Sequence, residues 1–261
     1  MYFFSVGAMF RNESHCISEW IEHYINQGAD HFYLVNDNST DNSIECIQKY
    51  MDRITLYNSN EIHILGHQRN TYNRFILPHL KETKWLLICD LDEFVYSPIY
   101  KSIPNFLEEV SQLAQIQITP TLFGSNNHIT QPASLVQYFT KRSEKVPSDC
   151  GTYKYFVNSD YEYISLNVHH ATPKNIEYQK EEYFKIINIP YIKLNHYICQ
   201  SKEFWIKIKC TRGDADGYLE RDMKLFDDYN SQINIKDDFE LAIINNKFKH
   251  LINPIDIHDV L

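Results

Sequence analysis

Apolar and polar positions along the first hundred residues follow two alternating patterns, one of strand type and one of helix type. Short apolar runs rich in β-forming residues have the length of buried strands. These runs are residues 3–10, 31–37, 54–59 and 85–94. Between the first two, Ile17, Trp20 and Tyr24 recur at helical spacing, and residues 38–51 and 67–80 have similar patterns. Strands that alternate with helices predict an α/β fold with a mostly parallel central sheet flanked by helices.

The alternation weakens after Pro98, where strand-like runs are separated by irregular polar loops. The further strands predicted in this part lie within residues 115–128, 153–158 and 189–199. A helical pattern returns at residues 233–252. Because no linker separates these parts, we expect one continuous domain over residues 1–220, followed by a helical tail at residues 221–261.

Polar side chains follow the predicted strands at three points. Asn12 and Glu13 follow the first strand, and the polar stretch 37–41 follows the second. Asp90 and Asp92 lie at the end of the fourth. In open α/β sheets, ligands bind outside the carboxyl ends of the strands. We therefore expect these three clusters to form one shared site.

The sequence WLLICDLDEF leads an apolar strand directly into three carboxylates. Asp90 and Asp92 are two residues apart, so in an extended chain they share a face. Neighbouring carboxylates repel unless a cation lies between them, and Mg²⁺ or Mn²⁺ binds such oxygens together with substrate phosphates. The pattern favours a metal–diphosphate site, with two upstream arginines, Arg69 and Arg74, as a complement to phosphate. An acidic strand end exposed to water is the alternative.

Composition and charge narrow the classes of protein. The chain has 261 residues, 43% of them hydrophobic, and a net charge of −9, as in ordinary soluble domains. No basic segment favours nucleic acid, whose phosphates need a basic face. The six cysteines form no C-x-x-C pair and several lie in apolar runs, which indicates reduced thiols. Because no signal peptide or membrane span is evident, we expect a cytoplasmic protein.

Three segments of the N-terminal half are specific as a set: RNESHCISEWIEHYINQGADHFYLVNDNSTD, HQRNTYNRF and WLLICDLDEFV. This set resembles the GT-A glycosyltransferases, and within them glycosyltransferase family 92 and the related family-2-like group. Weaker similarity continues in TLFGSNNH, LNVHHA, LNHYICQSKEFW and KCTRGDAD, so the resemblance covers residues 5–217. Thr121 stands where the family usually has Trp, and Asn127 where Gly is usual. Both departures lie in the expected acceptor region.

The resemblance implies a GT-A fold in which residues 1–105 bind a nucleotide sugar and residues 106–220 bind the acceptor. It implies transfer of a hexose, galactose being favoured, from a UDP-sugar to a glycan or other hydroxyl acceptor. Inversion at the anomeric carbon and a Mn²⁺ or Mg²⁺ cofactor are implied as well. The oligomeric state stays open.

Positions that match the family motif would take the metal and donor roles. Asp90, Asp92 and His196 would hold the metal, for which an imidazole nitrogen is a suitable ligand. Lys207, Lys209 and Arg212 could reach a diphosphate or lie on solvated surface. The full set of expected donor contacts is Asn12, Glu13, Asp37, Gln68, Arg69, Tyr72, Asn73, Asp90, Lys207 and Arg212.

An inverting reaction needs a carboxylate base that takes the proton of the acceptor hydroxyl. The candidate bases, each in a polar loop, are Asp149, Asp214 and Asp216. We expect residues 121–151 to select the acceptor, with Asn127 and His128 in contact with it. His169 and His170 would point to opposite faces of a strand, so only one of them, His170, is expected near the acceptor.

Three alternatives accompany this interpretation. A haloacid-dehalogenase-like phosphatase also has D-x-D with Mg²⁺, but Phe94 stands where that family has Thr or Val. A sugar-binding module that kept the fold without the activity is the second. The third concerns His63 and His67, which could bind zinc on a helix. Gly66 and the absence of an evident third ligand favour loop histidines instead.

Overall fold

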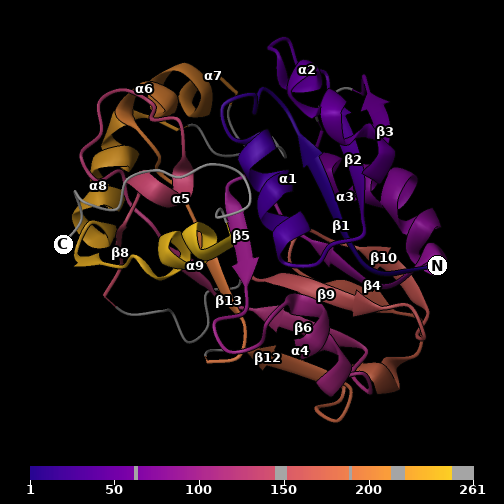
Figure 1. The fold of residues 1–261 in the computed structure, drawn as a ribbon. Helices are drawn as coiled ribbons and strands as arrows, with labels where there is room; N and C mark the ends of the chain where they lie inside the picture. Colours follow the sequence, from indigo (N-terminus) through magenta and orange to yellow (C-terminus); the bar gives the residue numbers. More distant parts are fainter. Residues whose placement is uncertain (62–63, 145–151, 188–189, 213–220, 249–261) are drawn as a thin grey trace.

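The computed structural model describes residues 1–61, 64–144, 152–187, 190–212 and 221–248, and only the backbone at 187, 212, 247 and 248. Its centre is a seven-stranded sheet in the order β12-β6-β9-β4-β1-β2-β3 (Figure 1). The strands in that order are Phe184–Ile187, Gln115–Ile118, Lys154–Asn158, Thr83–Ile88, Tyr2–Phe10, His31–Asp37 and Ile54–Ser59. Every neighbouring pair is parallel except the two pairs of β9. The predicted mostly parallel sheet is confirmed.

Alternate side chains of the central strands fill two cores, one on each face of the sheet. Phe4, Val6 and Ala8 of β1 belong to the first core, whereas Leu86 and Ile88 of β4 belong to the second. The first core contains side chains of α1 (Ile17–Asn26) and α4 (Ile103–Glu109). The second contains side chains of η2 (Tyr72–Ile76), η3 (Leu77–Glu82), β10 (Tyr163–Leu166) and β11 (Ala171–Pro173). Because successive side chains of a strand point to opposite faces, the continuous apolar runs seen in the sequence supply both cores.

The helical segment that begins with α3 (His67–Thr71) packs closely on the sheet at Gly7. A Cβ atom at this position would lie 2.9 Å from Ile88 Cδ1 and 3.0 Å from Ile76 Cγ2. Such distances are too short for real Cβ contacts, so glycine is what allows this approach. The packing fixes the segment that carries Gln68 and Tyr72 against β4.

A second, three-stranded sheet follows the acidic turn directly. Its order is β5 (Glu93–Tyr96), β13 (Lys193–His196) and β7 (Pro120–Leu122), with β13 in the middle. β13 is antiparallel to β5, and their register places His196 opposite Glu93. Two segments that are a hundred residues apart in the sequence thereby meet at the end of β4.

The C-terminal part differs from the continuous helical pattern expected at residues 233–252. Helix α8 (Met223–Ile233) ends there, and β14 (Lys236–Asp237) follows and pairs with β8 (Lys141–Arg142). Helix α9 (Glu240–Phe248) begins only afterwards. The helical expectation was therefore wrong at 236–237, where a ladder with a distant strand decides the conformation.

The expected boundary after residue 220 lies outside the described residues. Leu241 of α9 nevertheless belongs to the main core, and α9 lies beside β5 and α5 (Leu135–Tyr138) (Figure 1). The tail therefore packs against the body of the fold. The remaining short elements are α2 (Ser43–Ile47), η1 (Gln48–Arg53), η4 (Ile176–Gln179), α6 (Lys202–Phe204), η5 (Trp205–Lys209) and α7 (Cys210–Arg212).

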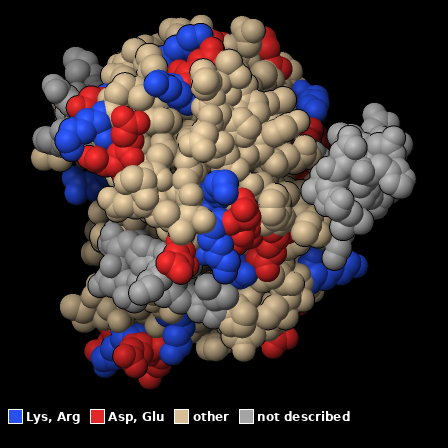
Figure 2. Space-filling model, turned by 90° about the vertical axis from the view of Figure 1, so that its left-hand side faces the viewer, with Lys and Arg blue, Asp and Glu red and all other residues tan. Residues whose placement is uncertain are grey.

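Charged side chains of both signs are interspersed on the surface. On the side of the molecule shown in Figure 2, blue and red groups lie next to one another within wide uncharged areas. The described part of this face thus has no extended basic surface. Across the residues described, no helix is long and apolar enough to cross a membrane. Five cysteines are free thiols in this part of the chain, namely Cys16, Cys46, Cys89, Cys199 and Cys210, and Cys150 lies outside it.

Candidate active site

The loops after β1 and β2 are joined by hydrogen bonds. Asn12 has a positive φ of 57°, and its Oδ1 accepts a hydrogen bond from the Thr40 N–H at 2.8 Å. The Glu13 N–H donates to Ser43 Oγ at 2.9 Å. The first two polar clusters found in the sequence therefore lie side by side at one edge of the sheet, as the position of strand ends in a parallel sheet predicts.

Asp37, at the end of β2, is paired with a histidine that the sequence did not mark as important. Its Oδ1 lies 3.0 Å from His67 Nε2, and both side chains are buried. His67 is the first residue of α3, so its interpretation as a loop histidine was wrong, and His63 lies outside the described residues. The pair fixes the start of α3 beside β2, one residue before Gln68.

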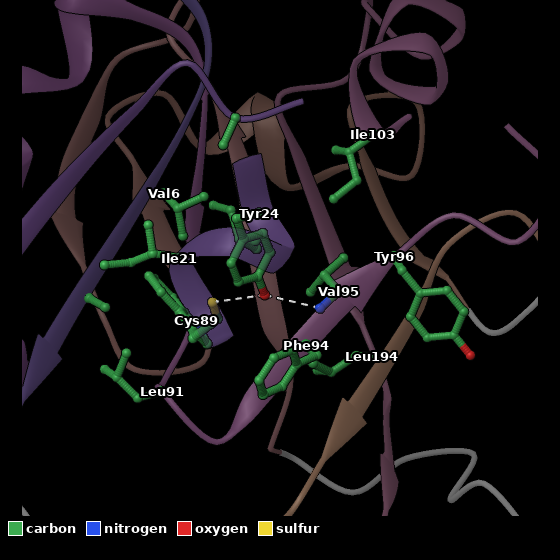
Figure 3. Close-up of a cluster of buried hydrophobic side chains, with 14 of the residues drawn as sticks. Val6, Ile21, Tyr24, Cys89, Leu91, Phe94, Val95, Tyr96, Ile103 and Leu194 are labelled. Carbon is green, nitrogen blue, oxygen red and sulfur yellow. Dashed lines mark hydrogen bonds between the residues drawn. The ribbon is translucent and has the colours of Figure 1, made fainter. Parts of the chain in front are cut away.

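The acidic turn after β4 is held from below by helix α1. Trp20 donates its indole N–H to the carbonyl oxygens of Asp90, at 2.9 Å, and Glu93, at 3.1 Å. The Tyr24 hydroxyl donates to the Glu93 carbonyl at 3.1 Å. It also accepts the Val95 N–H at 2.9 Å (Figure 3). Because both aromatic rings are buried, they also fix the distance between α1 and the turn. This clamp gives a physical reason for the Trp of the helix in the motif.

Asp90 accepts three side-chain hydrogen bonds. Gln68 Nε2 and the Tyr72 hydroxyl donate to Oδ1 at 2.9 and 3.3 Å. Lys154 Nζ donates to Oδ2 at 2.7 Å and lies 3.3 Å from Glu93 Oε2. Burial raises the pKa of Asp90, but the Lys154 ammonium more than offsets this, and the pKa is lowered. Burial raises the pKa of Glu93, which the same ammonium opposes without reversing.

Asp92 lies between a lysine and a histidine. Lys209 Nζ donates to Oδ2 at 2.7 Å, and His196 Nε2 lies 3.7 Å from Oδ1. The His196 Nδ1 atom lies 3.6 Å from Glu93 Oε1. Burial opposes ionisation of Asp92, yet Lys209 and His196 hold its pKa well below the ordinary value. Burial lowers the pKa of His196, but the two carboxylates more than offset this and raise it.

The donor atoms at Asp92 and His196 fit a divalent cation in chemistry. A carboxylate oxygen and an imidazole nitrogen are both ligands of Mn²⁺, and donor phosphates commonly complete such sites. Within the described ranges, the group of three possible ligand atoms within 4.8 Å of one another is Glu13, His15 and Cys16. The expected set of Asp90, Asp92 and His196 is not such a group, so Asp90 stays a predicted ligand.

Four of the other residues expected at the donor have contacts elsewhere, are exposed, or lie outside the described atoms. Asn73 exchanges two hydrogen bonds with the backbone of Leu166, both at 2.8 Å, so its amide holds β10. Arg69 is exposed. Lys207 is exposed and pairs with Glu203 at 2.6 Å. The side chain of Arg212 lies outside the described atoms. For these four residues, contact with the donor stays a prediction.

Residues expected at the acceptor lie on irregular loops. Asn127 is exposed with a positive φ of 61°, and His128 Nε2 lies 3.1 Å from the Tyr138 carbonyl. Of the histidine pair, His170 is exposed, whereas His169 interacts electrostatically with the charged groups of the acidic turn. Burial and the Lys154 ammonium lower the pKa of His169, although Asp90 opposes this. The three candidate bases, Asp149, Asp214 and Asp216, lie outside the described residues.

The loop that carries Asn127 is fastened to α8 by amide side chains. Asn230 Oδ1 accepts the Ser125 N–H at 2.8 Å, and Asn234 Oδ1 accepts the Asn126 N–H at 3.0 Å. A Cβ atom on Gly124 would lie 2.3 Å from Asn234 Oδ1, so glycine is required there. This attachment was not predictable, because it joins residues more than a hundred positions apart.

Two buried lysines pair with the carboxylates of the acidic turn, and the sequence interpretation did not predict these contacts. Lys154 is 1% exposed and Lys209 is 5% exposed. A usable signal was present for the first: a lysine in the apolar run YKYFVN is almost never fully buried without a partner. The partner itself could not be named, since it is set by the position of β9 between β4 and β6.

The chain is similar to known proteins in sequence and in structure. The model of glycosyltransferase family 92 matches residues 1–237. This chain belongs to glycosyltransferase family 92. The resemblance seen in the sequence is thereby confirmed, as is the GT-A class of the fold. No relative of this family-92 chain was found among curated proteins.

Solved structures are similar to this family-92 chain at low identity. Staphylococcus aureus TarS 1–349 has a TM-score of 0.45 at 14% identity, over 75% of this chain and 60% of that chain. Its complex with UDP-GlcNAc has a TM-score of 0.44 at 14% identity, over 77% and 60%. Glucosyl-3-phosphoglycerate synthase from Mycobacterium tuberculosis, with Mn²⁺, UDP and glucosyl-3-phosphoglycerate, has 0.31 at 12%, over 46% and 44%. The family-92 chain thus spans 60% of the length of TarS 1–349.

Proposed function

We propose that this family-92 protein is a metal-dependent, inverting glycosyltransferase that moves a hexose from a UDP-sugar to a hydroxyl acceptor. Membership in the family supports the class of reaction. One observation supports the metal–diphosphate site most: His196 Nε2 lies 3.7 Å from Asp92 Oδ1. It depends on the β5–β13 register, so a distant strand delivers a nitrogen ligand to the acidic turn.

In this proposal the acidic turn holds a cation, and the cation binds the leaving diphosphate. Asp92 and His196 would hold the cation, with Asp90 beside them, and the bound cation would neutralise charge on the departing UDP. Gln68 and Lys154 orient the Asp90 carboxylate through hydrogen bonds at 2.9 and 2.7 Å. Such preorganised charges stabilise the transition state because they need no rearrangement as the reaction proceeds.

The nucleoside and the acceptor are assigned to different sides of the turn. Asn12, Glu13 and Asp37 would contact the nucleoside. Their loops are adjacent to the turn through the Cys16 thiol. Burial raises the pKa of this thiol, and so do the neighbouring carboxylates of Glu13 and Asp92. Residues 121–151 would contact the acceptor. Galactose as the sugar and a glycan as the acceptor are carried over from the family resemblance.

The phosphatase alternative has weak support from the geometry. In such an enzyme Asp90 would attack phosphorus, yet its carboxylate accepts hydrogen bonds from Gln68, Tyr72 and Lys154. The Lys154 ammonium lowers the pKa of Asp90, and with it the nucleophilicity of the carboxylate. An inactive module that still binds a UDP-sugar differs from the proposed enzyme only in turnover, so an assay must separate the two.

The test is UDP release from a panel of UDP-sugars, with Mn²⁺ or with EDTA. We expect turnover with Mn²⁺ alone, and Asp92→Asn should lower the rate about a hundredfold or more while the fold is kept. Asp160→Asn is the matched control, since Asp160 is exposed and pairs with Lys84 on the surface. Tight binding of UDP in the presence of Mn²⁺, without UDP release from any UDP-sugar, would favour the inactive module. Equal affinity for UDP with Mn²⁺ and with EDTA would exclude the metal.

A further inference from the structure

The acidic turn is neutralised by two lysines of the chain itself. Asp90 and Glu93 share the ammonium of Lys154, at 2.7 and 3.3 Å, and Asp92 has that of Lys209 at 2.7 Å. Both lysines are almost completely buried. Buried charges are stable only when they are paired, so these lysines are part of the folded turn. A cation added to this turn meets positive charge that is already present.

The two lysines are held in different ways. Lys154 belongs to β9, which lies in the central sheet between β4 and β6, and its ammonium lies between two carboxylates. Lys209 is the last residue of the short π-helical segment η5, and its only described carboxylate partner within 4.0 Å is Asp92. Its stem passes the ring of Phe204, with Nζ 5.8 Å from the ring centre. Lys209 is therefore attached to the turn through a single charge pair.

That pair involves the carboxylate proposed to hold the metal. Asp92 Oδ2 accepts from Lys209, and Asp92 Oδ1 faces His196. A divalent cation at Asp92 would lie within a few ångströms of an ammonium, and the repulsion is strong in a partly buried site. A diphosphate changes this balance, because it brings negative oxygens for both the metal and the ammonium.

We propose that Lys209 makes metal binding at Asp92 conditional on the donor diphosphate. Without nucleotide, Lys209 is the counter-ion of Asp92 and opposes the metal. With nucleotide, its ammonium binds a diphosphate oxygen, and the metal binds Asp92. Linkage requires that the metal then strengthens nucleotide binding by the same factor as nucleotide strengthens metal binding. The inference rests on the proposed function and adds an order to its binding steps.

The test measures Mn²⁺ binding to the full chain by electron paramagnetic resonance of the free ion, with and without UDP. In the wild type we expect UDP to tighten Mn²⁺ binding at least about tenfold. Lys209→Met and Lys209→Gln should tighten Mn²⁺ binding without UDP by about tenfold or more, and should reduce the effect of UDP. Lys202→Met, which removes an exposed charge six residues after His196, is the matched control and should change neither value.

The outcomes separate this inference from the proposed function. If a folded Lys209 variant binds Mn²⁺ without UDP no better than the wild type, Lys209 has only a structural role and the inference is wrong. If the wild type binds UDP and its affinity for Mn²⁺ is the same with and without UDP, the inference fails even where no variant folds. If the Lys209 variants gain Mn²⁺ affinity but no variant or wild type binds UDP, the antagonism stands and the proposed donor is wrong.

Discussion

The proposed donor side and the proposed acceptor side of this protein are built by different physical means. On the proposed donor side, charged groups follow the ends of central strands, and buried ammonium groups pair with them, as Lys154 does with Asp90. On the acceptor side, a loop with Asn127 at positive φ is held by neutral amides of α8. Buried charge pairs fix the geometry, and removal of one partner is strongly destabilising. Amide contacts on loops tolerate substitution better. The difference indicates where substitutions should be felt.

The largest expected effect is on Lys154 of the donor side. Lys154→Met removes an ammonium that is 1% exposed and leaves Asp90 and Glu93 without it. Breaking a buried pair in this way costs about 3–5 kcal/mol of the free energy of unfolding. Urea denaturation measures this loss. Lys224→Met is the control, because Lys224 pairs with Asp228 on the surface of α8, where such pairs contribute little to stability.

A similar loss in both variants would remove the distinction between the two sides. It would mean that the network at the acidic turn relaxes, for example by protonation of Glu93, whose pKa is already raised by burial. Restoring stability with Lys154→Met combined with Glu93→Gln would then identify the carboxylate that loses its partner.

The sequence was informative about the donor side because its elements are local or periodic. Strand alternation predicted β1 to β4, and the D-x-D pattern predicted the carboxylates at the end of β4. The pairing with Lys154 was beyond the sequence, since it needs the single antiparallel strand to enter between β4 and β6. His196 was identified from the family motif, and the physical reason for its place is the β5–β13 register.

The acceptor side could hardly be predicted, for a related reason. Its contacts, such as Asn126 with Asn234, join irregular segments by single amides and leave no period in the sequence. β14 shows the same limit, because its pairing with β8 is a tertiary contact that overrides a local helical pattern. The candidate bases were chosen only as acids in polar loops, and they stay predictions.

A smaller effect is expected from pH, through a buried histidine that holds α1 to the donor side. His23 Nε2 lies 2.8 Å from the Val95 carbonyl, and Nδ1 lies 3.3 Å from Asn245 Oδ1 in α9. Burial lowers the pKa of His23 to about 4 from an ordinary 6.5, although both hydrogen bonds oppose the shift. The unfolded chain therefore takes up the proton first as pH falls. The contribution is complete above pH 6.5 and is lost progressively toward pH 4.

Between pH 6.5 and pH 5 this histidine should cost about 2 kcal/mol of the free energy of unfolding. Urea denaturation at pH 7.5 and pH 5 measures the change, and His23→Gln, which keeps a donor for Val95, should show that much less pH dependence. Because other groups titrate in both proteins, only the difference between them is used. An equal pH dependence would show that His23 is neutral in the unfolded chain as well, or accessible to protons in the folded one.

The smallest effect on stability is expected at Asn127, where the acceptor side can be tested without disturbing the donor side. The side chain is exposed and φ is 61°, a conformation that glycine adopts at no steric cost. Asn127→Gly should therefore keep the loop and change the free energy of unfolding by about 0.5 kcal/mol or less. Asn127→Ala is the contrasting variant, since its β-carbon costs about 1 kcal/mol relative to glycine in this conformation and, unlike asparagine, it has no polar group that can bond locally. If the carboxamide binds the acceptor, loss of one hydrogen bond should lower kcat/KM for transfer by about tenfold in both variants.

UDP binding by calorimetry and slow hydrolysis of the donor by water should stay unchanged, because neither uses this loop. Loss of UDP binding in a folded Asn127→Gly protein would mean that the donor and acceptor sides have been assigned the wrong way round.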